Sequence, residues 1–260
     1  IFTCRSIFSS YELCVRRSFW KSTVSGLHGK KGYKARTRTR LSMSLSQSVE
    51  DYLKAIYLLE IDGVVATTNN IAESLSVSSA SVTNMFKKLA KLQLINHKSY
   101  RGAELTKAGE KIALEVIRHH RLLELYLKEM MGYSWDQVHD EAEKLEHHIS
   151  EQFEDKIAEL LNDPTHDPHG DPIPSKEGVV PEMASLAITD ADENESYIIG
   201  RVRDQDPELL RFLEKSGIIP GVQVTILEKT PFDGPVKIKL EDKETTIGNS
   251  VAKDVFLVEK

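Results

Sequence analysis

The sequence predicts a mainly α protein that ends in a small β domain, and three observations support this fold class. Apolar residues recur at helical spacing through most of residues 43–161. A stretch rich in Pro, Asp and Gly follows at residues 162–181 and predicts a linker or an irregular loop. From about residue 182 to 260, strand patterns replace the helical ones and predict a small β-barrel. A chain of 260 residues is therefore expected to form two or three domains.

The first 42 residues differ in composition from the rest of the chain. They hold ten Lys or Arg and one acid, Glu12, whereas the remainder holds 24 basic and 39 acidic residues. Both cysteines, Cys4 and Cys14, lie in this leader, which excludes disulfides and thiolate metal sites elsewhere. An Arg-rich, Ser-rich leader resembles an organelle transit peptide. The favoured alternative is upstream sequence translated in frame before a true start at Met43, so residues 1–42 are expected to be disordered or not native.

A first helix is predicted from Ser46 to about residue 62. Ser48, followed three residues later by Asp51, fits a capping box, and Val49, Leu53 and Ile56 form a buried face. Asp51 has two competing interpretations on spacing alone, because an acid near a helix start stabilises the helix without binding a metal.

Two short helices are predicted next, at residues 67–75 and 76–89, and a tight polar turn joins them. This arrangement is typical of a helix-turn-helix. In the second helix, Val82, Met85, Phe86 and Leu89 form the apolar stripe. Residues 92–105 then predict a two-stranded hairpin, the wing, so that residues 43–106 form a winged helix-turn-helix.

Basic residues gather around this motif although the body of the chain is acidic. Between residues 87 and 107, six Lys or Arg face one acid, Glu104. A local basic patch is what binding to phosphates requires, and DNA binding is therefore predicted. The residues expected to enter the major groove are Ser78, Ala80, Ser81, Thr83 and Asn84, and those expected to contact phosphates are Lys87, Lys88, Lys98, Tyr100 and Arg101.

A long helical region is predicted from residue 106 to about 161, as three helices with a break at residues 132–134. His139, Glu143, Glu146 and His147 are spaced to share one helix face, and His120 and Glu124 repeat the i, i+4 spacing on the preceding helix. Histidines and carboxylates at this spacing can converge on a cation. The alternative is a solvated acidic helix, which the joint pattern disfavours.

Three motifs resemble the diphtheria toxin repressor family of metal-dependent regulators, which includes the manganese regulators. They are Ser48-Val-Glu-Asp-Tyr-Leu-Lys-Ala-Ile-Tyr57, Arg118-His-His-Arg-Leu-Leu-Glu124 and Val138-His-Asp-Glu-Ala-Glu-Lys-Leu-Glu-His-His148. In this order and spacing they are highly specific, and the resemblance runs from about Met43 to Lys260. It implies a cytoplasmic homodimeric regulator, not an enzyme, that binds double-stranded operator DNA when manganese(II) or, alternatively, iron(II) is bound.

The resemblance also implies domains and ligands. A helical metal-binding and dimerisation domain is expected at residues 107–181 with its linker, and a C-terminal barrel of the SH3-like, FeoA type at residues 182–260. The implied primary metal site is Asp51, His120, Glu143, Glu146 and His147, and the ancillary ligands are Glu124 and His139. By similarity to three-domain manganese members, Asp167, His169 and Asp204 are expected to complete a second site, with an ordinary loop as the alternative.

Two departures from the family pattern bear on the metal. Iron-responsive members have sulfur ligands at the positions of Asp51 and Glu143, and hard carboxylate oxygens suit manganese better. Lys54 stands where two-domain manganese regulators have a glutamate ligand, which argues against a two-metal primary site.

The expected mechanism is that a cation joins Asp51, which leads into the DNA-binding domain, to ligands of the helical domain. Such a bridge would fix the separation of the two recognition helices of a dimer. Three alternatives use the same residues differently: a winged-helix regulator that responds to an organic ligand, a metal-dependent hydrolase, and a metal-handling protein that does not bind DNA. No run of about 18 uncharged apolar residues occurs, so no membrane partner is expected.

Overall fold

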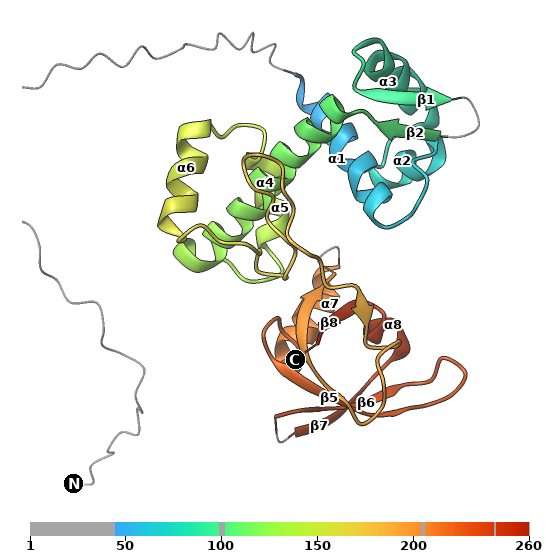
Figure 1. Cartoon of the computed structure of the whole chain (residues 1–260), viewed down its shortest axis with the longest axis vertical. Helices are drawn as coiled ribbons and strands as arrows, with labels where there is room; N and C mark the ends of the chain where they lie inside the picture. Colours follow the sequence, from blue (N-terminus) through green and yellow to red (C-terminus); the bar gives the residue numbers. More distant parts are fainter. Residues whose placement is uncertain (1–44, 99–101, 204–205, 242, 260) are drawn as a thin grey trace, which may run out of the picture. The chain divides into compact units, whose positions relative to one another are not determined.

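The computed structural model describes residues 45–98, 102–203, 206–241 and 243–259 (Figure 1). The leader, Tyr100, Arg101 and Asp204 lie outside the described residues. The elements from the N-terminal side are α1 (Gln47–Ile61), α2 (Thr68–Ser74), α3 (Ser79–Lys91), β1 (Ile95–Lys98), β2 (Gly102–Leu105), α4 (Lys107–Met131), α5 (Val138–Leu145) and α6 (Glu151–Leu160). They are followed by β3 (Leu186–Ala187), β4 (Ser196–Val202), α7 (Pro207–Ser216), β5 (Gln223–Lys229), β6 (Val236–Leu240), β7 (Lys243–Ile247), α8 (Asn249–Ala252) and β8 (Val255–Val258).

The first three helices and the β1–β2 hairpin form the predicted winged helix-turn-helix. Buried residues of α1 and α3, among them Leu53 and Phe86, share one apolar core with β1 and β2. The hydroxyls of Thr67 and Ser78 cap α2 and α3 by accepting from backbone N–H groups two or three residues into each helix. The capping-box prediction for α1 was wrong, because the helix begins at Gln47 after Ser46 and Ser48 lies inside its first turn.

The predicted long helical region consists of α4, α5 and α6, with the break where it was expected. Gly132 adopts a left-handed conformation (φ 74°) and ends α4, a position that glycine takes without the strain of a Cβ atom. Leu122, Leu123, Val138 and Ile157 belong to the apolar core that α4, α5 and α6 share. This packing holds the polar faces of α4 and α5 against each other.

The segment of residues 162–181 is irregular, as predicted, but it is not an exposed linker. Residues 167–174 are buried. Two arginines of α4 satisfy its backbone: Arg118 donates to the carbonyl of Pro174 (2.7 Å) and Arg121 to that of Pro172 (2.6 Å). Charged donors from a long helix thus replace the solvent that a loop of this composition usually needs.

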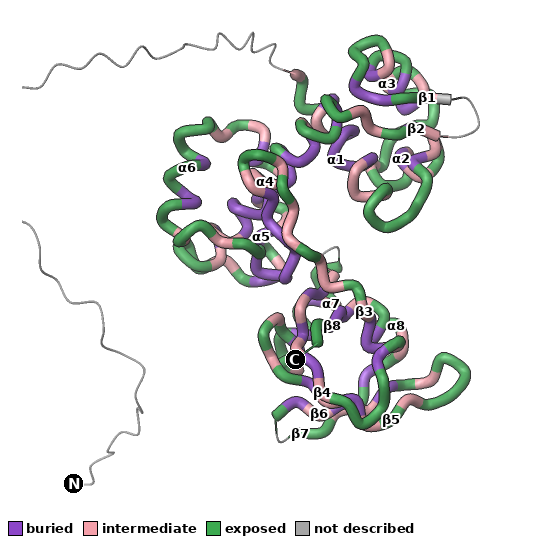
Figure 2. The backbone as a smooth tube through the Cα atoms, viewed as in Figure 1, coloured by how far each residue is buried: buried purple, intermediate pink, exposed green. Residues whose placement is uncertain are grey.

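The C-terminal part is an antiparallel sheet with the strand order β3-β8-β4-β5-β6-β7. Buried and partly buried residues alternate along β4 and β6, which places one face of each strand in a common core (Figure 2). Phe232 and Asp233 have positive φ angles and lie in the turn between β5 and β6. Within the described residues, no helix is both long and apolar enough to cross a membrane.

Candidate metal centre and DNA-binding surface

Helix α3 presents most of the residues that were predicted to contact DNA. Its apolar stripe, Val82, Phe86 and Leu89, is fully buried. Ser78, Ala80, Ser81, Asn84, Lys87 and Lys88 are exposed, and Thr83 is half-buried. The hydroxyl of Ser78 caps the helix, and that of Thr83 donates to the carbonyl of Ser79 at 2.9 Å. The side chains of Asn84, Lys87 and Lys88 therefore extend from a helix whose other face is anchored in the core.

The predicted wing contacts cannot be placed in the same way. Lys98 ends β1, but its side chain, Tyr100 and Arg101 lie outside what the structure describes. Their expected contacts with phosphates remain predictions.

A first group of possible ligands joins α1 to the end of α5. Asp51, Glu146 and His147 each offer one ligand atom, and the three atoms lie within 4.8 Å of one another. His147 Nε2 is 2.7 Å from Asp51 Oδ1 and 3.3 Å from Glu146 Oε1. The winged helix and the helical region thus meet at this group.

The orientation of His147 suits a metal ion. Glu50 Oε2 is 2.7 Å from His147 Nδ1, and because a carboxylate only accepts, Nδ1 carries the proton. When the ring is protonated, Nε2 pairs with the carboxylate of Asp51 at 2.7 Å. When the ring is neutral, Nε2 carries the lone pair and faces oxygens of Asp51 and Glu146, so a divalent cation placed between them would be coordinated by all three residues. A histidine oriented by a carboxylate is typical of metal sites.

A second group lies beside the first, between α4 and α5. It comprises His120, His139 and Glu143, whose ligand atoms also lie within 4.8 Å of one another. His120 Nε2 is 3.2 Å from His139 Nδ1, and Glu143 Oε1 is 3.9 Å from His120 Nδ1. The two groups touch where His120 Nδ1 approaches Glu146 Oε2 at 2.5 Å.

The structure thus brings together the five residues expected for the primary site but divides them between two adjacent groups. The reason is the end of α5. The helix stops at Leu145 and the chain turns, with the His148 N–H donating to the Leu145 carbonyl (2.9 Å). His147 therefore lies beside Asp51, whereas His139 and Glu143, still inside the helix, lie beside His120.

A third group is buried where α4 meets the irregular segment. Glu124, Asp167 and His169 form it, and all three are buried. Glu124 Oε1 also lies 2.9 Å from His120 Nε2 and 3.2 Å from His139 Nδ1, so Glu124 connects the second and third groups. Asp167 and His169 were predicted for a second site together with Asp204, which lies outside the described residues.

Trp135 fixes the ring of His169, a role that sequence analysis missed. The two rings stack with centroids 5.4 Å apart and planes at 21°. His169 Nε2 is 3.1 Å from the Trp135 carbonyl, which can only accept, so this nitrogen carries a proton. In the neutral ring His169 Nδ1 then has the lone pair, 3.9 Å from Glu124 Oε2. Trp135 and its carbonyl thereby direct Nδ1 into the third group.

Lys54 lies at the centre of the first two groups. Its Nζ donates to Glu143 Oε1 at 2.6 Å and to the two oxygens of Glu146 at 3.0 and 2.8 Å, and it is 3.2 Å from His120 Nδ1. Sequence analysis noted Lys54 only as a departure from a ligand pattern. The structure shows it as the buried positive partner of two expected ligands.

Electrostatic interactions hold Lys54 and Glu146 in their charged forms. Burial favours the neutral amine of Lys54, but the charges of Glu146 and Glu143 together raise its pKa above the usual value. Burial would raise the pKa of Glu146, yet the hydrogen bond from His120 and the charge of Lys54 lower it. In Asp51, burial prevails over the attraction of His147 and raises the pKa.

The pKa of Asp167 in the third group shifts in the opposite direction to that of Glu146, although Arg121 Nε lies 3.7 Å from Asp167 Oδ2. Burial and the nearby charges of Asp171 and Glu124 raise the pKa of Asp167 well above its usual value. For Glu124, burial is outweighed by His120 and His139, which hold its pKa well below normal.

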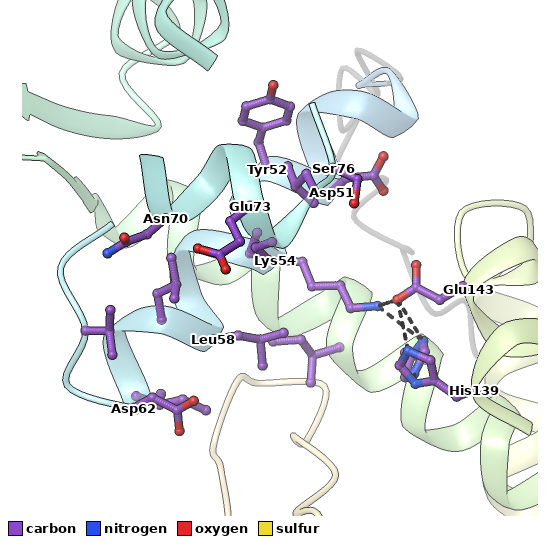
Figure 3. Close-up of a pocket in the computed structure, with 18 of the residues that line it drawn as sticks. Asp51, Tyr52, Lys54, Leu58, Asp62, Asn70, Glu73, Ser76, His139 and Glu143 are labelled. Atoms are coloured by element: carbon purple, nitrogen blue, oxygen red, sulfur yellow. Dashed lines mark hydrogen bonds and ion pairs between the residues drawn. The ribbon is translucent and has the colours of Figure 1, made fainter. Parts of the chain in front are cut away.

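A pocket of about 960 Å³ opens onto the first two groups. Its wall includes Asp51, Lys54, His120, His139 and Glu143 together with residues of α1 and α2. Figure 3 shows the Lys54 side chain extending from α1 towards Glu143 and His139 at one side of this pocket. Asp51, His120, His139 and Glu143 can therefore be reached from solvent through this pocket.

Three family models match consecutive parts of the chain. The iron-dependent repressor N-terminal DNA-binding domain matches residues 44–103, and the iron-dependent repressor metal-binding and dimerisation domain matches residues 106–175. The FeoA domain matches residues 186–259, the region of the antiparallel sheet.

Proteins with similar sequences are named as repressors or as transcriptional regulators. The chain is 31% identical over 223 residues to the iron-dependent repressor IdeR of Mycobacterium tuberculosis, covering 81% of this chain and 96% of that protein. It is 32% identical over 196 residues to the diphtheria toxin repressor of Corynebacterium efficiens, covering 71% and 85%. Over 114 residues it is 40% identical to the regulator MntR of Lysinibacillus sphaericus, covering 44% and 81%.

Solved structures agree with these relatives. A manganese-dependent transcriptional repressor in complex with manganese is similar with a TM-score of 0.77 and 32% identity, covering 82% of this chain and all 100% of that one. The cadmium-bound repressor ScaR is similar with a TM-score of 0.70 and 32% identity, covering 82% and 99%. The matched proteins are repressors, not enzymes, and the chain belongs to the diphtheria toxin repressor family of metal-dependent transcriptional regulators.

Proposed function

We propose that the chain is a homodimeric repressor that manganese(II) activates for binding to operator DNA. The observation that carries this proposal is the meeting of Asp51 in α1 with Glu146 and His147 beyond α5. Three donors from two separately packed parts of the chain converge there, and the lone pair of an oriented imidazole faces two carboxylates. Asp51, Glu146 and His147 would hold the activating cation, with His120, His139 and Glu143 beside them.

The donor atoms favour manganese. All three groups consist of carboxylate oxygens and imidazole nitrogens, without thiolates. Hard oxygen donors suit manganese, whereas sulfur donors favour softer metals. Iron(II) is the alternative, since relatives are named for iron as well as for manganese. Glu124, Asp167 and His169 form the proposed second site, which would tie the irregular segment to α4.

The activating step follows from where the ligands are attached. Asp51 belongs to α1, whose buried residues share a core with recognition helix α3, whereas Glu146 and His147 follow α5. A bound divalent cation supplies the positive charge that the facing carboxylates require. Asp51 thereby fixes the orientation of α3 with respect to the helical region. Converting a mostly incompetent ensemble to a mostly competent one takes roughly 5 kcal/mol of differential binding.

The dimer is proposed to form through the helical region. Large apolar side chains are exposed at the end of α4 and on α6, namely Met130, Met131, Phe153 and Leu160. They lie within the segment that matches the metal-binding and dimerisation domain. Two α3 helices at a fixed separation would then read half-sites about one helical turn apart, or a multiple of it, in roughly palindromic DNA.

The proposed surface for DNA is the exposed side of α3 with the wing. Asn84 and the hydroxyls of Ser78, Ser81 and Thr83 would approach base edges, with Ala80 as an apolar contact. Lys87, Lys88, Lys98, Tyr100 and Arg101 would contact phosphates. Short hydroxyl side chains discriminate bases weakly, so the shape of the DNA is expected to contribute to specificity.

DNA fragments selected from a random library in the presence of manganese test this function. Fluorescence anisotropy should show binding to a selected fragment that a chelator abolishes and that added manganese restores. The same titration with iron(II), cobalt(II) and zinc(II) compares the metals. The variant Glu146→Ala/His147→Ala should lose the response to metal while its winged helix stays folded, as followed by circular dichroism.

Two results would contradict the proposal. Affinity for the selected DNA that does not change on chelation would rule out the metal switch. A folded double variant with the response of the unmodified protein would rule out Glu146 and His147 as ligands. A stronger response to iron(II) than to manganese would correct the metal and leave the mechanism in place.

A further inference from the structure

The ammonium group of Lys54 lies among the candidate metal ligands although a positively charged lysine cannot bind a cation. Its ammonium group bonds both oxygens of Glu146, one oxygen of Glu143, and lies within reach of His120 Nδ1. These are three of the five residues that the sequence led us to expect in the primary site, and Glu146 is one of the three proposed to hold the activating cation. A metal ion and the ammonium group therefore need the same lone pairs.

The distances do not leave room for both cations in their best positions. Bonds from divalent metals such as zinc to carboxylate oxygens are about 2.0–2.2 Å long. An ion bound to Glu146 Oε2, which is 2.8 Å from Lys54 Nζ, would lie within about 5 Å of the ammonium group. Positive charges this close repel strongly in a buried site, because little water screens them. Lys54 is buried, and the side chain of Glu146 is fully buried.

We infer that Lys54 is an internal competitor of the activating cation, which has to release Glu146 before that carboxylate binds metal. The ammonium group stabilises the buried carboxylate of Glu146 and the partly exposed carboxylate of Glu143 in the metal-free protein. It thereby raises the metal concentration at which the site fills. This inference rests on the metal site proposed above, and it makes Lys54 a residue that sets affinity without being a ligand.

The structure provides the means for Lys54 to move. A lysine side chain has a flexible four-carbon stem, and its ammonium group is readily hydrated. Lys54 lies in the wall of the solvent-open pocket that reaches His139 and Glu143. On release from Glu146, the ammonium group can turn into this pocket and keep its contact with Glu143, whose side chain is 43% exposed.

If Lys54 helped the metal to bind, its removal would change the metal affinity in the opposite direction. If Lys54 merely positioned the carboxylates for the metal, its removal would weaken metal binding. If it competes, removal frees the Glu143 and Glu146 oxygens that the ammonium group held, while His120 stays beside Glu146, and a divalent cation can bind them without displacing a positive charge. The variant Lys54→Met, which keeps the stem and removes the charge, is therefore expected to bind manganese at least tenfold more tightly.

The experiment is a titration of the full chain with manganese chloride, followed by calorimetry and by the electron paramagnetic resonance signal of free manganese. Lys54→Gln, which also lacks the charge but can donate to one carboxylate, serves as the second variant if Lys54→Met does not fold. The matched control is Lys144→Met, because Lys144 lies on α5 between the same acids in sequence but its side chain is exposed and pairs with Glu141. The control should bind manganese as the unmodified chain does.

Thermal unfolding gives a second readout. Without metal, the Lys54 variants should unfold at a lower temperature than the unmodified chain. At the same excess of manganese, their midpoints should rise by more than that of the unmodified chain, since the stabilisation by a ligand increases with the logarithm of its affinity. Manganese binding by Lys54→Met or Lys54→Gln that is equal to or weaker than that of the unmodified chain would overturn the inference. If the unmodified chain bound no manganese or iron(II), the metal site itself would be wrong.

Discussion

The polar residues of α3 and those of α4 and α5 lie on helices of similar amphipathic character, yet their hydrogen bonds differ in reach. Ser78 bonds Ser81 three residues away, and Thr83 bonds Ser79 four residues away. On α4 and α5, by contrast, His120 bonds Glu146 and Glu143 bonds Lys54, across 26 and 89 residues. The hydrogen bonds on α3 stay within that helix and its cap, whereas those on α4 and α5 connect parts of the chain that are far apart in sequence.

This difference explains what each region can do. A helix whose polar groups are satisfied locally keeps its remaining side chains, Asn84, Lys87 and Lys88, available for an outside partner. A helix pair whose polar groups are satisfied by distant residues responds when any one of those residues changes. The DNA-binding surface should therefore tolerate substitutions in the three groups of candidate ligands. Metal binding by these groups, in contrast, should depend on residues that are not ligands.

The strongest test of this contrast is Glu50→Ala, because Glu50 is not a candidate ligand itself but accepts a hydrogen bond from the candidate ligand His147. Removal of the carboxylate leaves His147 Nδ1 without its acceptor, so the ring can turn and the lone pair on Nε2 is no longer directed at Asp51. Loss of such an outer partner typically weakens metal binding 10- to 100-fold. Manganese calorimetry should show a loss of about this size.

A conservative variant separates orientation from charge. Glu50→Gln keeps an oxygen that can accept from His147, so it should lose less affinity than Glu50→Ala. If Glu50→Ala bound manganese as tightly as the unmodified chain, the long-range connection through His147 would be unimportant, and the contrast between the two regions would be weaker than the structure indicates.

The sequence predicted those parts of the molecule that depend on local spacing. The helix-turn-helix, the break at Gly132 and the pairing of His120 with Glu124 all follow from residues at most a few positions apart. The family matches agree with the fold class predicted for the chain. Periodicity carries this information because it determines which side chains share a face.

Contacts across long stretches of sequence could not be predicted in this way. Glu50 and Lys54 lie on the predicted first helix, and nothing in their spacing indicates that they meet His147 and Glu146 about 90 residues later. The end of α5 at Leu145 likewise has no strong stop signal, so the four residues of its predicted face were assigned to one helix. Which ligand joins which group depends on that helix end.

A smaller effect is expected for the DNA-binding surface. The double variant Lys87→Ala/Lys88→Ala removes two exposed charges from α3 and leaves its buried stripe intact. If both contact phosphates in each subunit of the dimer, four contacts are lost, and the slope of log affinity against log salt should fall in magnitude by about 4, with weaker binding to all sequences. Fluorescence anisotropy across a salt series measures this slope, and the affinity for manganese should not change.

The control for this variant is Lys156→Ala, which removes an exposed charge from α6, away from the helix-turn-helix. It should leave the salt slope unaltered. A slope that stayed the same in the double variant would remove Lys87 and Lys88 from the proposed phosphate contacts.

The smallest expected effect concerns the stability of the helical region without metal. Glu154 of α6 accepts hydrogen bonds from Arg118 Nε (2.5 Å) and lies 3.2 Å from His119 Nε2, both on α4. Burial alone would raise the pKa of Glu154, but these partners lower it from 4.5 to about 2. Because the folded-state pKa is below the unfolded value, the ionised group stabilises the fold above about pH 4.5, and this contribution is lost as the pH falls towards 2.

Glu154→Gln should accordingly lower the unfolding midpoint at pH 7 by about 2–4 °C, the shift expected for roughly 1 kcal/mol in a chain of this size. The difference from the unmodified chain should shrink below pH 4.5 and vanish near pH 2, since protonation then neutralises Glu154 itself. Glu159→Gln, at a mostly exposed position of the same helix, should not change the midpoint at any pH. A difference that persisted unchanged at pH 2 would show that Glu154 contributes packing and not charge, so this long-range contact would owe nothing to the arginine and histidine of α4.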